Sequence, residues 1–167
     1  MWLGKFAYEP TQLKPIKHHH NTHNHNPNAM NNKNTPVSVA VGVILRGDNV
    51  FLAKRPGSVH LGGLWEFPGG KVDGKESVEE ALIRELHEEL GLTLVHDNLS
   101  HQFDIDWQYA EKRVLLNVYT VTNFTGDPVG AEGQDVAWVN VKTLADYPLP
   151  EANAQIVTWL QENERFR

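Results

Sequence analysis

Two apolar runs on either side of a short polar turn begin the part of the chain that has a regular hydrophobic pattern. The first run starts at Val37 and reads Val-Ser-Val-Ala-Val-Gly-Val-Ile-Leu, and the second starts at Val50 and reads Val-Phe-Leu-Ala-Lys. The turn between them, at residues 46–49, reads Arg-Gly-Asp-Asn, which is typical of the link between paired strands. We predict further strands at residues 102–109, 113–124 and 135–141, the middle one being rich in Val, Leu and Tyr.

Helical periodicity is clearest over residues 77–90. Ser77 and Glu80 stand three residues apart in the relation of a capping box, and Gly91 after the run suits the left-handed end of a helix. A second helix is predicted at about residues 151–164. Strands before, between and after two helices predict an α/β fold, in which helices pack on a mixed sheet.

Size and composition indicate one folded domain at residues 36–167. The chain has 167 residues, of which 40% are hydrophobic, and this is enough apolar material for a single core. Residues 1–35 differ, because they combine a tract of histidines with many asparagines and few aliphatic residues. Such a composition cannot offset the entropy lost on ordering, so we predict a disordered leader there. The alternative for its histidines is a loose transition-metal site.

Charge and cysteine content exclude several classes of partner. A formal net charge of -6 argues against a protein that grips polymeric DNA or RNA through a broad basic surface. The absence of cysteine excludes disulfides, thiolate metal sites and a cysteine nucleophile. The sequence has neither the apolar run of a signal peptide nor a stretch of membrane-spanning length. We therefore expect a cytoplasmic protein with no membrane partner.

Three glutamates crowd one side of the helix predicted at residues 77–90. Glu85, Glu88 and Glu89 are neighbours on a helix, where like charges repel. Helical spacing places Glu85 and Glu89 at the edge of the apolar stripe, where packing removes part of their water, and it places the single Arg84 on the opposite, solvated side. Clustered carboxylate oxygens suit Mg²⁺ or Mn²⁺. The alternative is an ordinary charged surface.

A longer motif surrounds these glutamates. A glycine is followed after five residues by a glutamate, and after seven more by Arg-Glu, an aliphatic residue, any residue, Glu-Glu, any residue, glycine and an aliphatic residue. The residues that meet this pattern are Gly70, Glu76, Arg84, Glu85, Leu86, Glu88, Glu89, Gly91 and Leu92. In this arrangement the chain resembles the Nudix hydrolases. The likeness is greatest to their MutT-type members and extends over residues 37–160, through the segments 54–55, 64–71, 131–134 and 152–153.

The resemblance implies both a fold and a reaction. The fold is an α/β/α sandwich, in which a mixed β-sheet lies between helices. The reaction uses water to split a nucleoside triphosphate into a nucleoside monophosphate and pyrophosphate, with Mg²⁺ as cofactor and Mn²⁺ as its substitute. Metal is needed because the triphosphate charge repels an incoming nucleophile. The metal ligands implied are Glu85, Glu88, Glu89, Glu132 and the backbone carbonyl of Gly69.

Two glutamates compete for the role of catalytic base. Glu85, oriented by the preceding Arg84, is the one that we favour. Glu132, on a predicted loop between strands, is the alternative, because family members differ in this role. For Arg84 the alternative is a surface ion pair with Glu80 or Glu88, four residues away on either side. Glu76 is interpreted as an orienting or loop-fixing group rather than a ligand.

The resemblance also implies residues that bind the nucleotide. They are Arg55, His60, Glu66, Phe67, Pro68, Gly69 and Asn153. A guanidinium fork at Arg55 matches phosphate geometry, although a solvated charge at the end of a strand is its ordinary alternative. Phe67 has an alternative place in the hydrophobic core.

Asn153 is the residue that bears most directly on which nucleobase the protein prefers. Guanine presents two acceptors on one edge, whereas the 8-oxo form carries a hydrogen on N7 and presents an acceptor beside a donor. A carboxamide offers a donor and an acceptor together, and so matches the oxidised base. The alternative is an N-cap at the start of the last helix. The segment 149–153 is one residue longer than its MutT counterpart, which affects where this amide is placed.

The substrate implied is 8-oxo-dGTP, whose hydrolysis to 8-oxo-dGMP and pyrophosphate cleans the nucleotide pool and prevents mutation. One alternative keeps the chemistry and changes the substrate to another nucleotide, such as a cytidine or methylated nucleoside triphosphate, or to a nucleotide sugar. Another is a Nudix module that senses a nucleotide without hydrolysing it, although such modules generally lose the carboxylates that this chain retains. A monomer that binds small molecules is expected.

Overall fold

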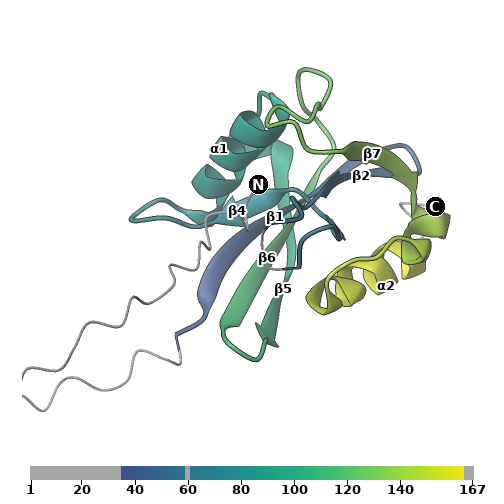
Figure 1. Ribbon diagram of the computed structural model, residues 1–167. Helices are drawn as coiled ribbons and strands as arrows, with labels where there is room; N and C mark the ends of the chain where they lie inside the picture. Colours follow the sequence, from purple (N-terminus) through teal and green to yellow (C-terminus); the bar gives the residue numbers. More distant parts are fainter. Residues whose placement is uncertain (1–34, 59–60, 164–167) are drawn as a thin grey trace, which may run out of the picture.

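The computed structural model of the chain describes residues 35–58 and 61–163. The leader predicted at residues 1–35 lies outside this part of the chain except for Thr35, and so does the predicted nucleotide-binding residue His60. The elements run in the order β1 (Val37–Arg46), β2 (Asn49–Lys54), β3 (Trp65–Glu66), β4 (Gly69–Lys71), α1 (Val78–Leu90), η2 (His96–Asn98), β5 (Leu99–Gln108), β6 (Arg113–Val121), β7 (Val136–Asn140), η3 (Val141–Asp146), η4 (Glu151–Asn153) and α2 (Ala154–Glu162) (Figure 1).

The strands form one mixed sheet that divides along β1. Strand β1 pairs in parallel with β6, while β5 and β6 are antiparallel. On its other edge, β1 pairs with β2 only beside the hairpin turn, at Leu45 and Arg46, and with β4 further back, at Val39 to Val41. Strands β3 and β7 then extend the sheet from β2. Because β1 changes its partner along its length, the sheet opens between β2 and β4.

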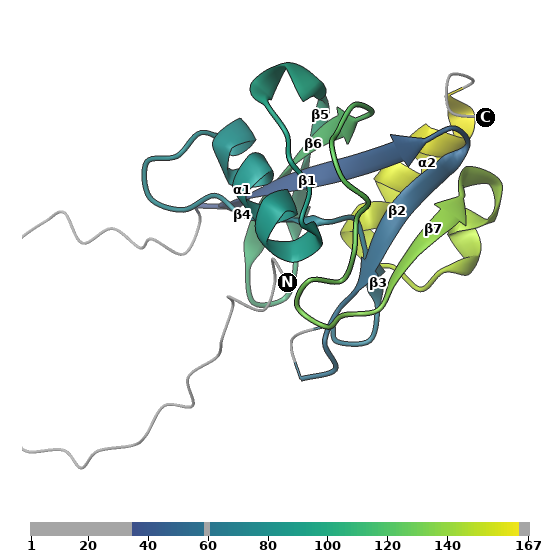
Figure 2. The ribbon, with the colours of Figure 1, turned by 90° about the horizontal axis from the view of Figure 1, so that it is seen from above.

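Helices α1 and α2 cover opposite faces of the sheet (Figures 1 and 2). Alternate residues of β1 supply the two cores, as the two-residue period of a strand requires. Val39, Val41 and Val43 belong to the core under α2, and Ala40 and Ile44 to the core under α1. The predicted α/β/α sandwich with a mixed sheet is therefore confirmed.

The ends of α1 follow the predicted signals. Ser77 Oγ accepts a hydrogen bond from the backbone N–H of Glu80 at 3.1 Å, and Glu80 Oε2 accepts one from the N–H of Ser77 at 2.7 Å. At the other end Gly91 has φ 70°, and its N–H donates to the His87 carbonyl. A Cβ at Gly42 of β1 would lie 3.2 Å from a Leu86 methyl, so this glycine lets the helix pack closely on the sheet.

Several boundaries differ from the sequence predictions. Strand β5 starts at Leu99 rather than at residue 102, and β6 ends at Val121 rather than at 124. The last helix is shorter than predicted, because η4 precedes it as a separate turn. The short strands β3 and β4 were not predicted, since two or three residues show no periodicity and depend on the neighbouring strand for their shape.

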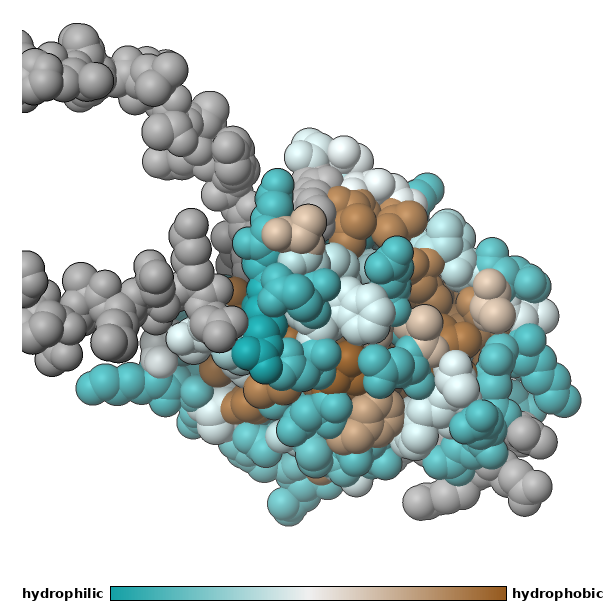
Figure 3. All heavy atoms as spheres, turned by 90° about the horizontal axis from the view of Figure 1, so that it is seen from below, coloured by the Kyte–Doolittle hydropathy of each residue, from teal (hydrophilic) through white to brown (hydrophobic). Residues whose placement is uncertain are grey.

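The surface offers few large apolar side chains. On the face seen from below, hydrophobic side chains form small areas separated by hydrophilic ones (Figure 3). Among the described residues, the large hydrophobic side chains that are exposed are Val95 and Val129. Over residues 35–58 and 61–163, the helices are too short or too polar to cross a membrane.

Candidate active site

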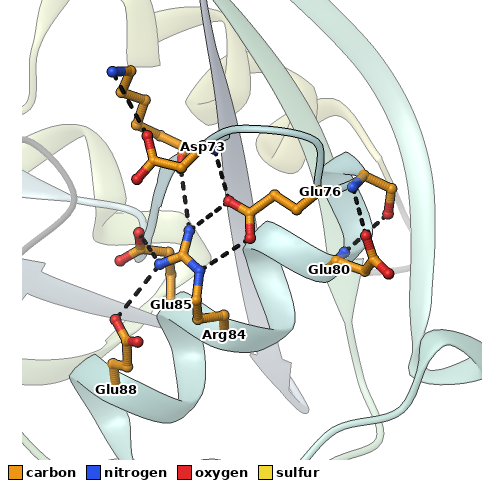
Figure 4. A network of polar contacts seen from close by, with 8 residues as sticks. Asp73, Glu76, Glu80, Arg84, Glu85 and Glu88 are labelled. Carbon is orange, nitrogen blue, oxygen red and sulfur yellow. Dashed lines mark hydrogen bonds and ion pairs between the residues drawn. The ribbon is translucent and has the colours of Figure 1, made fainter.

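Arg84 of α1 reaches back to the loop before the helix and holds several acceptors at once (Figure 4). Its Nε and Nη2 donate to the two carboxylate oxygens of Glu76, at 3.1 and 2.7 Å. Its Nη1 donates to Glu85 Oε1 at 2.6 Å, and Nη2 also donates to the Lys71 carbonyl at 3.3 Å. Such forked, charge-assisted bonds fix the guanidinium plane. Arg84 thereby ties the strand β4, the loop and the helix together.

The surroundings of Arg84 correct one prediction and support another. The side chain is 29% exposed and is not on a fully solvated face. The alternative ion pair with Glu88 exists, but at 3.5 Å it is the longest of these contacts, and Glu80 caps the helix instead. The hydrogen bonds that Arg84 donates, first of all to Glu76, raise the pKa of Arg84 further above its ordinary value. Glu76 has the orienting place that its interpretation assigned, and it also accepts from the N–H of Asp73 at 2.7 Å.

Two of the predicted metal-binding carboxylates are buried, and one of them lies against strand β4. Glu85 and Glu89 are each 2% exposed, so both charges are removed from water. A Cβ at Gly70 would lie 2.2 Å from the carboxyl carbon of Glu85, and one at Gly69 would lie 2.1 Å from the Ala40 carbonyl oxygen. Both glycines are therefore required by the close approach of backbone and side chain. The Glu85 carboxylate of α1 and the β4 backbone therefore meet in one place.

The donor set suits a hard divalent cation. Carboxylate oxygens from Glu85, Glu88 and Glu89 are the ligands that Mg²⁺ prefers, and Gly70 has no side chain in the place that the Glu85 carboxyl group takes. Within the described part of the chain, however, no three acidic or histidine side chains already converge as a metal-binding group. The side chain of Glu88 is 48% exposed and lies 3.5 Å from Arg84 Nη1.

The loop that carries Glu132 lies against the C-terminal end of α1. The N–H of Ala131 donates to the Glu89 carbonyl at 3.0 Å, and that of Val129 donates to the Leu90 carbonyl at 3.2 Å. Glu132 itself is exposed, as a metal ligand or base open to substrate must be. The fold thus brings the second candidate base next to the helix of metal-binding candidates, although the two are far apart in sequence.

A pocket of about 510 Å³ opens between this loop and the end of β2. Its lining residues are Lys54, Arg55, Pro56, Gly57, Gly63, Glu132, Gly133, Gln134 and Asp135. The predicted nucleotide-binding residue Arg55 and the predicted catalytic residue Glu132 therefore share one cavity.

Arg55 is held in a buried ion pair. Its Nη1 lies 2.6 Å from Glu66 Oε2, and the two side chains are 0% and 4% exposed. Its Nε donates to the Leu61 carbonyl at 3.1 Å. Burial raises the pKa of Glu66 to about 7, because loss of water penalises the carboxylate more than the facing guanidinium favours it. The alternative interpretation of Arg55 as a solvated charge at the end of a strand is wrong.

Phe67 and Pro68 lie inside the protein. Phe67 is 0% exposed and belongs to the core under α2, as its alternative interpretation had it. The Pro68 carbonyl accepts a hydrogen bond from the N–H of Gly42 at 2.8 Å. Both residues therefore shape the approach to Gly69 through packing, and neither Phe67 nor Pro68 exposes a side chain to solvent.

Asn153 stands where η4 passes into α2. It occupies the N-cap position, yet its side chain makes no capping hydrogen bond, so the capping alternative is wrong. The residue is 2% exposed, and within the described residues its Oδ1 is a buried acceptor that has no hydrogen-bond donor. Buried polar atoms are nearly always satisfied, so an acceptor of this kind calls for an explanation.

Two residues near this site gave no signal in the sequence. Tyr109, at the tip of the β5–β6 hairpin, is hydrogen-bonded to the backbone of Ala152. The charges of Arg55 and Glu66 both influence its pKa. Burial raises the pKa of Tyr109 and lowers that of Lys112, where the positive charge of Arg55 adds to the effect. A hairpin tip has no periodicity, and only the folded chain brings it to the turn that carries Asn153.

Comparisons with known proteins agree with this geometry. A NUDIX domain model matches residues 40–159. The 8-oxo-dGTP diphosphatase of Escherichia coli strain K12 is 32% identical over 126 residues, which are 75% of this chain and 96% of that protein. The CTP pyrophosphohydrolase of the same strain is 34% identical over 123 residues, 72% of this chain and 88% of that protein. The solved MutT NUDIX hydrolase from Burkholderia pseudomallei superposes with a TM-score of 0.68 at 29% identity, covering 74% of this chain and 97% of that one.

The matched region runs from β1 into α2 and includes every residue of the carboxylate motif. It therefore contains most of both cores, apart from residues at the ends such as Val39 and Leu160, together with the Arg84 network and the loop of Glu132. Sequence, fold and family model point to the same assignment, with each similar protein covered over most of its own length. The chain belongs to the Nudix hydrolase family, and within it is of the MutT type.

Proposed function

We propose that this protein is a Mg²⁺-dependent pyrophosphohydrolase that converts 8-oxo-dGTP to 8-oxo-dGMP and pyrophosphate. The observation that carries the choice of base is the buried Oδ1 of Asn153, an acceptor with no donor among the described residues. The N7–H of 8-oxoguanine is a donor for that oxygen, and the amide nitrogen of the same group suits O6. Ordinary guanine would place an acceptor against Oδ1. The name of the E. coli relative supports the same substrate.

The reaction needs neutralisation of the triphosphate and a base for water. Glu85, Glu88, Glu89, Glu132 and the Gly69 carbonyl would hold Mg²⁺, which when bound screens phosphate charge and lowers the pKa of water. Arg84 holds Glu85 at 2.6 Å, so this carboxylate is oriented to take the proton of the attacking water. Glu132 is the alternative base. Water attacks one phosphorus of the anhydride between the α- and β-phosphates. As the new P–O bond forms, the bond from that phosphorus to the bridging oxygen breaks, and the products are the nucleoside monophosphate and pyrophosphate.

The partners and the location follow from the same features. The described residues expose few large apolar side chains to a protein partner, and the pocket has the size of a small-molecule site. A cytoplasmic monomer that acts on free nucleotides is therefore part of the proposal. The residues assigned to the nucleotide site, besides Asn153, are Arg55, Glu66 and Gly69, together with His60 outside the described residues. Phe67 and Pro68, which are buried, would shape this site through packing.

A panel of nucleotides tests the substrate. Purified protein is given equal concentrations of 8-oxo-dGTP, dGTP and dCTP, and pyrophosphate release is measured with and without Mg²⁺. We expect the oxidised nucleotide to have the highest kcat/KM, and equal turnover of 8-oxo-dGTP and dGTP would refute the choice of base. Preference for dCTP would favour the second candidate, a cytidine nucleotide pyrophosphohydrolase, to which the similar CTP pyrophosphohydrolase points.

A single substitution separates catalysis from binding. In Glu89→Gln the buried carboxylate becomes a neutral amide of nearly the same shape, so one charge is lost from the metal site. We expect Mg²⁺-dependent pyrophosphate release to disappear while nucleotide binding, measured by calorimetry, persists. Inactivity of the unchanged protein on every nucleotide would instead favour a sensing module.

A further inference from the structure

The C-terminal end of α1 leaves backbone carbonyls for other segments to satisfy. The N–H groups of Gly91 and Leu92 turn back to the carbonyls of His87 and Leu86, at 2.9 and 3.3 Å. The carbonyl of Glu89 is then available to the following loop, and it accepts two donors rather than one. They are the backbone N–H of Ala131 and the side-chain Nε2 of Gln134, both at 3.0 Å.

Gln134 uses both ends of its carboxamide. While Nε2 donates to the Glu89 carbonyl, Oε1 accepts the backbone N–H of Glu132 at 3.0 Å. The planar carboxamide of Gln134 therefore connects Glu132, which is proposed as a ligand or base, to the backbone of Glu89, which is proposed as a ligand. The loop also closes on itself, because the N–H of Gly133 donates to the Gly130 carbonyl at 3.0 Å. At Gly130 a Cβ would lie 2.1 Å from the Gln134 carbonyl oxygen, so this bend requires glycine.

No other side chain serves this connection equally well. A glutamate at position 134 has no donor for the Glu89 carbonyl, and an asparagine is shorter by one methylene group. Gln134 also lines the pocket that contains both Glu132 and Arg55. These bonds of Gln134 therefore fix the position of the Glu132 backbone, from which the exposed Glu132 side chain extends at the edge of the cavity.

We propose that Gln134 is a positioning residue, whose carboxamide holds the Glu132 loop against the last turn of α1 so that Glu132 acts together with the carboxylates of that helix. This inference rests on the proposed function, because it assumes that Glu132 takes part in metal-dependent hydrolysis. A misplacement of about 1 Å at a catalytic group can cost roughly a hundredfold in rate. The loop clamp is thus expected to affect turnover more than substrate binding.

The test is a double-mutant cycle in the full-length protein. Gln134→Ala and the nearly isosteric Gln134→Glu are compared with Glu132→Gln and with the double variant Gln134→Ala/Glu132→Gln. We expect each Gln134 variant to lower kcat roughly tenfold or more, to change KM for the nucleotide less than about twofold, and to raise the Mg²⁺ concentration for half-maximal rate. In the Glu132→Gln background, Gln134→Ala should cause no further loss. Additive losses would mean that Gln134 acts independently of Glu132 and would overturn the proposal.

A matched control is provided by Gln102 on strand β5. Its Nε2 also donates to a backbone carbonyl, that of Ser100 at 2.9 Å, and to Thr120 Oγ1 at 3.0 Å. Gln102→Ala should therefore remove comparable bonds and leave kcat unchanged. An equal loss of kcat in this variant would show a general effect of removing a glutamine and would count against the proposal.

Hydrogen exchange separates this inference from the proposed function. The amide of Glu132 donates to Gln134, so Gln134→Ala should make it exchange several-fold faster, whatever nucleotide the protein hydrolyses. Faster exchange in a protein inactive on the nucleotide panel would refute the proposed function and support the clamp. Unchanged exchange together with unchanged kcat would overturn the clamp even if 8-oxo-dGTP proves to be the substrate.

Discussion

At the scale of the residue, the site contains one polar side chain with several hydrogen-bond partners and another that has a buried acceptor without a donor. Arg84 shares its guanidinium among Glu76, Glu85 and a backbone carbonyl, which leaves its orientation no freedom. Asn153 is the opposite case, because its buried Oδ1 is satisfied by no donor in the described part of the chain. The first arrangement orients the carboxylate that we propose as catalytic base, and the second is suited to a ligand that brings its own donor.

Asn153→Ala should change base preference with little effect on folding. Because Oδ1 makes no internal hydrogen bond, its removal costs little stability, whereas loss of a paired contact to the base costs roughly ten- to a hundredfold in discrimination. We expect the ratio of kcat/KM for 8-oxo-dGTP to that for dGTP to fall by this factor while Tm changes little. A large fall in Tm with an unchanged ratio would assign Asn153 a structural role.

Gly70→Ala should inactivate the enzyme through Glu85. A Cβ at this position would lie 2.4 Å from Glu85 Oε1, and backbone β4 is paired with β1, so the carboxylate is the group that must move. We expect kcat to fall roughly a hundredfold, with a circular dichroism spectrum like that of the unchanged protein. Retention of full activity would show that Glu85 tolerates displacement and is not the base.

The pKa of Glu66 predicts how stability depends on pH. Its pKa of about 7 in the folded protein lies above the ordinary 4.5, so between these values the folded state holds a proton that the unfolded state has lost. The stabilisation is therefore fully present below pH 4.5 and is lost as the pH rises through 7. The resulting change in the free energy of unfolding is on the order of 3 kcal/mol, because each pKa unit corresponds to about 1.4 kcal/mol. Glu66→Gln should flatten this part of the curve in urea titrations, and an unchanged slope would exclude Glu66 as its source.

At the scale of the element, α1 and the loop before it behave as one unit. The capping box at Ser77 starts the helix, and Glu76 connects the loop to Arg84 eight residues further on. Two glutamates therefore make contacts near the beginning of the helix. Glu80 caps the helix and contributes to stability, whereas Glu76 orients Arg84 in the candidate site. Comparing them shows which bonds serve catalysis.

Glu76→Ala and Glu80→Ala should separate these two roles. Each removes a carboxylate that accepts hydrogen bonds at the start of α1, and each should lower stability by about 1 kcal/mol, since Arg84 is partly exposed to solvent and screened. Only Glu76→Ala should also lower kcat, because only Glu76 orients Arg84. Equal kcat values in the two variants, measured with Tm, would show that the Arg84 network is structural only.

At the scale of the whole molecule, the opening of the sheet beside β1 positions the site. Strand β4 enters this opening and brings Gly69 and Gly70 under α1, while β2 and β3 diverge and carry Arg55 and Glu66. The loop of Glu132 then spans from the end of α1 to the end of β2. The residues proposed for catalysis and those proposed for nucleotide recognition therefore come from the two parts of the sheet that separate beside β1.

Removal of residues 1–29 should leave activity unchanged. Every group assigned a catalytic or binding role lies after residue 50, and the family match begins at residue 40. We expect kcat/KM for each nucleotide of the panel to agree with that of the full chain within about twofold, a range typical of changes remote from a site. A selective loss on one nucleotide would assign the leader a part in substrate choice.

The sequence by itself determined the reaction class and the helix that performs it. Capping residues, the apolar stripe and the spacing of Glu85, Glu88 and Glu89 are local features, and neighbours three or four apart on a helix are known before folding. The motif then indicated the family. By the same logic, the interpretation of Glu76 as an orienting group needed only the loop and helix in which it stands.

Only the tertiary structure decided how recognition and catalysis are joined. The burial of Arg55 with Glu66 depends on the pairing of β2 with β3, and the bond from Gln134 to Glu89 joins residues 45 positions apart. The capping alternative for Asn153 was reasonable from its position, yet its side chain makes no capping bond in the folded protein. Such contacts depend on which surfaces meet when the cores form. The hydrogen bonds in these contacts join residues that the helical or strand periodicity of the sequence does not bring together.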